Sequence, residues 1–121
     1  MRTPLTIGGH LDRAALVYGD RIGVTDEPDA PGGGLGALTY TRVRELARGQ
    51  AAGLDERGIG VGERVAVLSQ NSGRLLTSFF GVSGYGRVLV PINFRLSPVE
   101  IEYILEHSGA SMLLVDQELA D

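Results

Sequence analysis

The chain has 121 residues, a formal net charge of −4 and no cysteine. The length predicts one domain, and the acidic balance disfavours nucleic-acid binding, which normally needs a basic face. The lack of cysteine excludes disulfide bonds, thiolate metal sites and a cysteine nucleophile. All eleven basic residues are arginine, so this chain alone cannot supply a Schiff-base lysine or a phosphate-loop lysine. No run approaches the ~20 apolar residues of a membrane span, and residues 1–20 lack the apolar stretch of a signal peptide, so we expect a cytoplasmic protein.

The first half of the sequence predicts two helices that flank a hairpin. Apolar residues recur at helical spacing over residues 5–18 and again over residues 41–57. Residues 21–25 and 37–40 are strand-like, and the Pro- and Gly-rich residues 27–36 between them are typical of a loop. We therefore expect a small antiparallel hairpin with a long mobile tip.

The second half repeats a strand-plus-helix unit. Strand-like runs cover residues 64–68, 87–92 and 111–116, and they start at similar intervals along the chain. Asn71 or Ser72 can cap a helix after the first run, because both side chains accept hydrogen bonds from a helix N-terminus. That helix places four apolar residues at i, i+4 spacing: Leu75, Leu76, Phe79 and Phe80. Core packing is the simplest expectation for the Phe79–Phe80 pair.

The helix after the second run has the clearest start and stop signals in the chain. Ser97 and Glu100 form a capping box, and Pro98 stands at the first helical position. Gly109 follows the end of the same helix, where a left-handed residue is favoured. Residues 117–121 are compatible with the start of a further helix.

Consecutive strand–helix units form parallel sheets with right-handed crossovers. The predicted fold class is therefore α/β, with a three-layer parallel sheet of βα units, an N-terminal helix and a small antiparallel hairpin. Three parallel strands make a thin sheet that needs neighbours and helical cover on both faces. We therefore expect residues 1–121 to be an incomplete N-terminal piece of a larger protein.

Several motifs are explained better by structure than by chemistry. The sequence GIGVGE at residues 58–63 lacks the third glycine of a dinucleotide fingerprint and precedes a strand, so it predicts a helix stop and a turn. The sequence PGGGLG at residues 31–36 contains no lysine and is not followed by a predicted helix, so it predicts a flexible hairpin tip and not a phosphate-binding loop. His10 and His107 are too isolated for a metal site, and His107 suits the last turn of a helix. None of the serines stands in the G-x-S-x-G pattern of a nucleophile elbow, so the sequence does not predict a catalytic serine.

The corner formed by Asn93, Phe94 and Arg95 is the best candidate for a ligand contact. It follows directly after the predicted strand over residues 87–92, and open α/β sheets bind ligands at the carboxyl ends of their strands. The alternative is that Asn93 and Arg95 hold the turn and lie on the surface. On the residues alone, both interpretations stay open.

Four stretches together resemble the N-terminal segment of the AMP-forming acyl-CoA synthetases, in the adenylate-forming superfamily. These are LTY at residues 38–40, GVGERVAVL at residues 60–68, QNS at residues 70–72, and GRVLVPINFRLSPVEIEYIL at residues 86–105. Each stretch alone is weak evidence for the resemblance, but the four together, in this order and at this spacing, are specific for this family. The PINFRLS turn resembles the acyl-CoA synthetase branch, including its fatty-acyl members.

The resemblance implies a fatty-acid or carboxylate–CoA ligase that forms an acyl-adenylate from ATP and then a thioester with coenzyme A. It implies Mg, ATP and coenzyme A for the longer parent and none of them for these 121 residues, because the family's catalytic loops match no position here. No catalytic or metal-binding residue is therefore expected, and the chain alone should be inactive. Only Arg95 carries over, as a contact to a coenzyme A phosphate that some members make with an arginine in this turn.

Two other interpretations remain beside the resemblance. One is a stand-alone α/β module that binds a ligand or a partner without catalysis. A receiver-like version is disfavoured, because Leu68, Ser69 and Gln70 stand where such a domain needs acidic residues. The other is a scaffold or assembly piece, since exposed sheet edges favour pairing. For an incomplete sheet we expect homo-oligomers through its uncovered edge or face.

Overall fold

The computed structural model describes residues 6–26 and 34–115. The predicted tip of the hairpin and the predicted helix start after residue 116 lie outside these ranges. Along the chain the elements are α1 (Ile7–Tyr18), β1 (Ile22–Thr25), β2 (Ala37–Thr39), α2 (Tyr40–Glu56), β3 (Arg64–Leu68), α3 (Gly73–Gly81), the short 3-10 helix η1 (Ser83–Tyr85), β4 (Val88–Ile92), α4 (Pro98–Ser108) and β5 (Met112–Val115).

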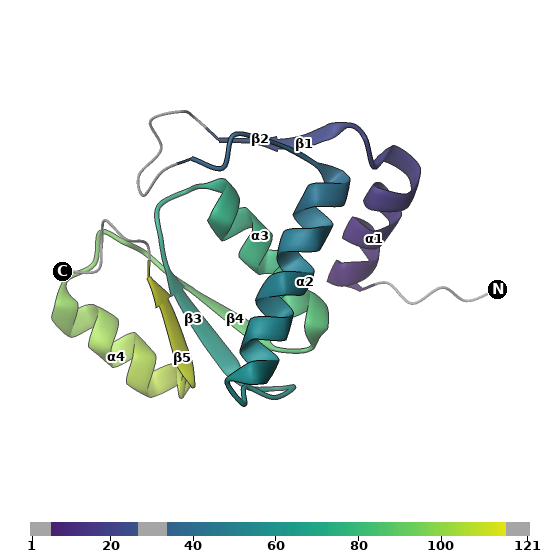
Figure 1. Ribbon diagram of the computed structural model, residues 1–121. Helices are drawn as coiled ribbons and strands as arrows, with labels where there is room; N and C mark the ends of the chain where they lie inside the picture. The colour runs from purple at the N-terminus through teal and green to yellow at the C-terminus, as the bar shows by residue number, and fades with distance from the viewer. Residues whose placement is uncertain (1–5, 27–33, 116–121) are drawn as a thin grey trace.

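The main sheet is parallel, as predicted, with the strand order β4-β3-β5. β3 is central: Leu68 pairs with Ile92 of β4 on one side and with Val115 of β5 on the other. Helices α2 and α3 cover one face of this sheet and α4 covers the opposite face, which gives the predicted three layers (Figure 1). The fold class predicted from the sequence is confirmed.

Side chains of β3 alternate between two separate cores. Val65 packs with Leu54 of α2 on one face of the sheet. Ala66 and Leu68 pack with Ile92 on the other face, where the apolar side of α4 covers them. Such alternation is what the two-residue period of a strand dictates, and it fixes the register of β3 against both neighbours.

The predicted hairpin is present as β1 and β2, which pair antiparallel with an irregularity between Ile22 and Val24. It packs with α1 and α2 around a third core. The second strand ends one residue earlier than expected, because Tyr40 already belongs to α2. The side chain of Thr39 accepts a hydrogen bond from the backbone N–H of Arg42 and so caps this helix.

Local capping signals placed most helix ends correctly. Ser72 caps α3, and Ser97 with Glu100 forms both hydrogen bonds of the capping box on α4. Gly58 and Gly109 have φ values of 77° and 66°, which only glycine adopts without strain. These positions confirm the stop after α2 and the stop after α4.

Helix α3 buries a different side from the one expected. Its buried residues are small or polar: Gly73, Thr77, Ser78 and Gly81. Phe79 is 40% exposed, so its expected core packing is wrong, whereas Phe80 packs against the hairpin core as expected. Leu76, on the same side as Phe79, is 42% exposed. The reason is close packing of α3 against α2, since a Cβ on Gly81 would lie 2.0 Å from Gln50 Oε1.

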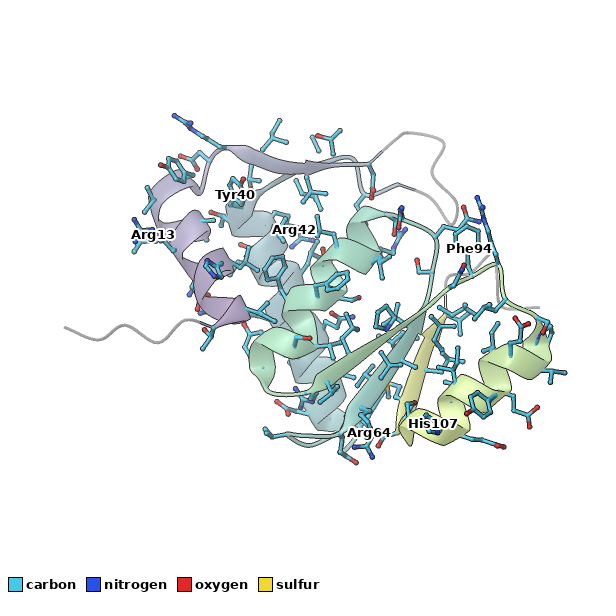
Figure 2. All side chains as sticks on the ribbon, turned by 180° about the vertical axis from the view of Figure 1, so that it is seen from behind. Arg13, Tyr40, Arg42, Arg64, Phe94 and His107 are labelled. Carbon is cyan, nitrogen blue, oxygen red and sulfur yellow. The ribbon has the colours of Figure 1, made fainter. Side chains whose placement is uncertain are left out.

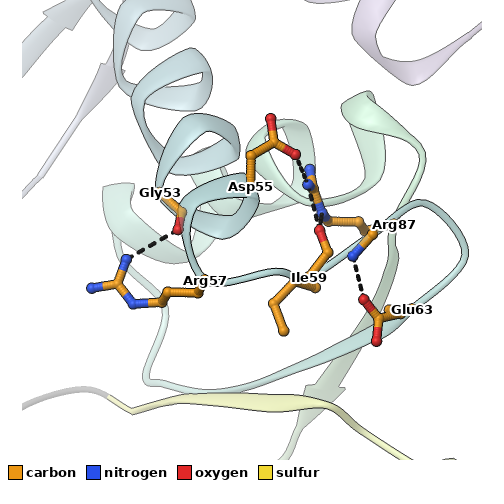
Figure 3. A network of polar contacts seen from close by, with 7 residues as sticks. Gly53, Asp55, Arg57, Ile59, Glu63 and Arg87 are labelled. Carbon is orange, nitrogen blue, oxygen red and sulfur yellow. Dashed lines mark hydrogen bonds and ion pairs between the residues drawn. The ribbon is translucent and has the colours of Figure 1, made fainter.

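A buried arginine, Arg87, stabilises the end of the sheet at which the parallel strands begin. The Arg87 guanidinium donates hydrogen bonds of 2.8 and 2.6 Å to the Ile59 carbonyl and forms an ion pair with Asp55 (Figure 3). The Arg87 side chain is 3% exposed, whereas that of Asp55 is 74% exposed. This contact joins the start of β4 to the loop after α2, at the amino ends of the strands and away from the candidate site.

Candidate ligand-binding edge of the sheet

The topology brings the carboxyl ends of the parallel strands β3, β4 and β5 to one edge of the sheet. The chain moves from β3 to β4 in one direction and then passes back across β3 to reach β5. The two crossover helices, α3 and α4, consequently lie on opposite faces (Figure 1). A reversal of this kind leaves a crevice at the carboxyl ends of β3 and β5, where doubly wound sheets bind ligands.

The corner after β4 is a tight turn fixed by Asn93. The Asn93 side-chain oxygen accepts a hydrogen bond of 3.0 Å from the Arg95 backbone N–H, and its carbonyl accepts one of 3.2 Å from the Leu96 N–H. Phe94 and Leu96 then pack into the core beneath α4. The turn anchors its two apolar residues inward and leaves Arg95 outside.

Arg95 lies exposed at the carboxyl edge of β4, as the sequence predicted. Its guanidinium carbon stands 5.5 Å from the centroid of the Phe94 ring, in the range of a cation–π contact. Figure 2 shows Phe94 at the corner that leads from β4 into α4. The ion pairs found among the described residues do not involve Arg95. Arg95 thus presents an exposed positive charge at this edge of the sheet.

A hollow of about 330 Å³ lies at the crevice between β3 and β5, on the face covered by α2 and α3. Its wall is mostly apolar, and it is lined by Leu35, Leu46, Gln50, Val67, Ser69, Arg74, Leu75, Thr77, Ser78, Leu114 and Val115. Arg95 is not among these residues. The edge thus has two separate parts, a charged corner beside α4 and an apolar hollow beside α3.

Asp26 is the residue of this region that sequence reasoning missed. It is 7% exposed, and its two carboxylate oxygens accept hydrogen bonds from Gly73 N at 2.5 Å and from Leu35 N at 2.9 Å. A negative charge at the first residue of α3 is favoured by the helix dipole. Asp26 precedes a predicted loop and lies 47 residues from Gly73, so no local signal could have found the contact.

The two histidines lie apart from this edge. His107 is in the last turn of α4, where its ring stacks on Tyr103 with the centroids 5.5 Å apart. His10 is on α1. Within residues 6–26 and 34–115, acidic and histidine side chains nowhere gather in a group of three that could hold a metal ion. In the same ranges, none of the helices has the length and apolar character needed to cross a membrane.

A protein-family model described as AMP-binding enzyme matches residues 9–121. The chain belongs to the AMP-binding enzyme family. Among the curated proteins of similar sequence is a long-chain-fatty-acid–CoA ligase of Thermus thermophilus. It is 40% identical over 119 residues, which are 98% of this chain and 21% of that protein. A 4-hydroxybutyrate–CoA ligase of Metallosphaera sedula is 36% identical over 95% of this chain and 19% of its own length.

Solved structures agree with this membership. The N-terminal domain of FACL13 from Mycobacterium tuberculosis matches 93% of the chain with a TM-score of 0.80 and 34% identity, and the match covers 27% of that structure. An anthranilate–CoA ligase in complex with anthranoyl-AMP matches 98% of the chain with a TM-score of 0.85 and 30% identity, over 22% of its length. This AMP-binding enzyme chain therefore spans about a fifth of the length of the curated relatives it matches.

Proposed function

We propose that the chain is the first subdomain of the N-terminal domain of an AMP-forming acyl-CoA ligase, with residues 1–121 as one unit. The observation that carries this proposal is the family match, which extends over residues 9–121. The doubly wound sheet supports it, because the carboxyl edge of such a sheet is the place where nucleotides and other ligands bind.

The proposed substrate of the whole enzyme is a fatty acid, with Mg-ATP and coenzyme A as its cosubstrates. The name of the Thermus relative, a long-chain-fatty-acid–CoA ligase, supports this acid class. Other relatives are named for 4-hydroxybutyrate and 3-hydroxybenzoate, so the acid is the least constrained part of the proposal. A cytoplasmic location is proposed from the sequence alone.

The 121 residues alone are proposed to form no acyl-adenylate. Adenylyl transfer needs charge neutralisation around the phosphates, and the chain contains no lysine that could supply it from a phosphate loop. The test is exchange of labelled pyrophosphate into ATP in the presence of a fatty acid and Mg. Exchange no greater than that of heat-denatured protein is expected, and exchange above that background would overturn the proposal.

Arg95 is proposed to contact a phosphate of coenzyme A in the whole enzyme. Two observations support this role: Arg95 is exposed, and it lies directly after β4 at the carboxyl edge of the sheet. The ion pairs among the described residues also do not involve Arg95. A charge-assisted hydrogen bond is worth roughly 1.5–3 kcal/mol, so Arg95→Ala should raise the KM for coenzyme A about ten- to a hundredfold.

The experiment on Arg95 separates the two half-reactions. In a hybrid enzyme that carries this chain in place of the matching residues of the Thermus ligase, Arg95→Ala should leave pyrophosphate release without coenzyme A unchanged. Arg95→Lys should restore binding only in part, because an ammonium group keeps the charge but loses the planar fork. An equal fall in both half-reactions would make Arg95 structural, and no change in either would end the assignment.

A second candidate function is a stand-alone module that binds a ligand without catalysis. The hollow between α2, α3 and the β3–β5 crevice favours it, because about 330 Å³ is enough for a small apolar ligand. Thermal shifts with short-chain fatty acids and with AMP distinguish the two candidates. Saturable stabilisation of the isolated chain would support the module, and its absence would leave the ligase subdomain as the better account.

A further inference from the structure

Three consecutive backbone N–H groups in the corner after β4 already have partners within the chain. The Arg95 N–H donates to the Asn93 side-chain oxygen at 3.0 Å, and the Leu96 N–H donates to the Asn93 carbonyl at 3.2 Å. The next one, that of Ser97, donates to Glu100 Oε2 at 3.2 Å. These amides are therefore not the donors that an anion would use here, which leaves the Arg95 guanidinium as the charged donor of the turn.

The ring of Phe94 lies between the protein core and this guanidinium. Phe94 is half-buried and packs against the core beneath α4, as does Ile101 (Figure 2). The guanidinium carbon of Arg95 stands 5.5 Å from the centroid of the same ring, and a cation is attracted to an aromatic face within about 6 Å. A ring that the core holds in place thus restricts where the exposed arginine side chain lies.

We propose that Phe94 is a positioning residue for Arg95, whose guanidinium it holds at the carboxyl edge of β4 toward a phosphate of coenzyme A. This inference rests on the proposed contact between Arg95 and coenzyme A. An arginine that is already restrained loses less side-chain freedom when it binds, so the ring strengthens binding without touching the ligand. A cation–π contact at an exposed site corresponds to about a two- to fivefold change in affinity.

A purely structural role of Phe94 makes a different prediction. If the ring only anchored the turn, its loss would act on both half-reactions, and it would act equally with or without the guanidinium of Arg95. If the ring acts through Arg95, its effect on coenzyme A disappears when the arginine is absent. A double-mutant cycle measures this difference, because it isolates the coupling between two residues in contact.

The first test reads the contact by NMR in the 121-residue chain itself. Protons above an aromatic face are shifted upfield, so the side-chain protons of Arg95 should be shifted and should be identified by their loss in Arg95→Ala. Phe94→Leu keeps an apolar side chain in the core and should abolish the shift, whereas Phe94→Tyr should retain it. Arg21, which stands 5.2 Å from the Tyr18 ring centroid, is the internal control, and its resonances should be the same in every variant.

The second test is the double-mutant cycle in the hybrid enzyme. Phe94→Leu should raise the KM for coenzyme A about two- to fivefold and leave pyrophosphate release without coenzyme A unchanged. Phe94→Tyr should restore the KM, and Phe94→Leu should have no further effect in the Arg95→Ala background. Ile101→Val is the matched control, because it loosens the same core without touching the ring, and it should leave the KM unchanged. Circular dichroism verifies folding, and Phe94→Met replaces Phe94→Leu if that variant is unfolded.

Three results would overturn the proposal. They are Arg95 resonances that Phe94→Leu leaves unchanged, an effect of Phe94→Leu on the KM that persists in the Arg95→Ala background, and no effect of Phe94→Leu where Arg95→Ala does raise the KM. Failure of the proposed coenzyme A contact is distinguishable from these. Arg95→Ala would then leave the KM unchanged, and the positioning role would fall with that contact even if the NMR shifts show the ring beneath the guanidinium.

Discussion

Replacement of Arg87 by alanine tests the account of how this chain is held together. The Arg87 side chain is almost completely buried and donates two hydrogen bonds to the Ile59 carbonyl. Hydrogen bonds from a charged donor contribute roughly 1.5–3 kcal/mol, and loss of the buried stem adds about 1 kcal/mol of packing. The ion pair with Asp55 adds at most about 1 kcal/mol, because the Asp55 side chain is mostly in water. Arg87→Ala should therefore lower the free energy of unfolding by about 2.5–5 kcal/mol.

The assay is urea or thermal unfolding followed by far-UV circular dichroism. The expected loss corresponds to a fall in Tm of about 10–20 °C for a domain of this size. Arg57→Ala is a matched control, because the exposed Arg57 side chain donates a hydrogen bond to Gly53 O at the end of its own helix (Figure 3). It should change stability by less than about 0.5 kcal/mol. Asp55→Ala should also be mild, and an effect of Arg87→Ala as small as that of Arg57→Ala would refute the reasoning.

Three further predictions concern glycine and capping positions. Gly73→Ala should destabilise the chain by about 2 kcal/mol, because its Cβ would lie 2.7 Å from Asp26 Oδ2. Gly49→Ala, in α2 with no atom within 4 Å of the new Cβ, should stabilise it by roughly 0.5–1 kcal/mol in the same melts, and effects of the same sign would contradict the clash. Ser97→Ala should cost about 1 kcal/mol by removing the capping box of α4, and an unchanged Tm would mean that this helix end is held by other contacts.

The sequence was most informative where the controlling contacts are local. The start and end of α4 followed from Ser97, Glu100, Pro98 and Gly109, which all act within one helix. The parallel sheet followed from the repeat of strand–helix units, and the position of Arg95 at the carboxyl edge followed from that sheet. Its role toward coenzyme A stays a prediction, because no ligand contact enters the geometry.

Non-local contacts escaped the sequence for a physical reason. The bonds from Arg87 to Ile59 and from Gly73 to Asp26 join residues 28 and 47 positions apart, and nothing in either neighbourhood marks the partner. The sequence predicted the wrong buried side for α3, because apolar spacing favoured the side with Phe79. In the structure α3 lies close against α2, and this close approach requires small residues such as Gly81 on the buried side. Strand order was likewise beyond periodicity, since β4 and β5 have similar patterns and lie on opposite sides of β3.

The hybrid enzyme gives the most direct test of the central claim, that this chain is the first subdomain of an acyl-CoA ligase. The chain replaces the matching segment of the Thermus ligase, with which it shares 40% identity over 119 residues. The measurement is fatty-acid-dependent exchange of labelled pyrophosphate into ATP, beside the unaltered Thermus enzyme. The account predicts exchange by the hybrid and none by the 121-residue chain alone. A folded hybrid without exchange, or exchange by the isolated chain, would contradict it.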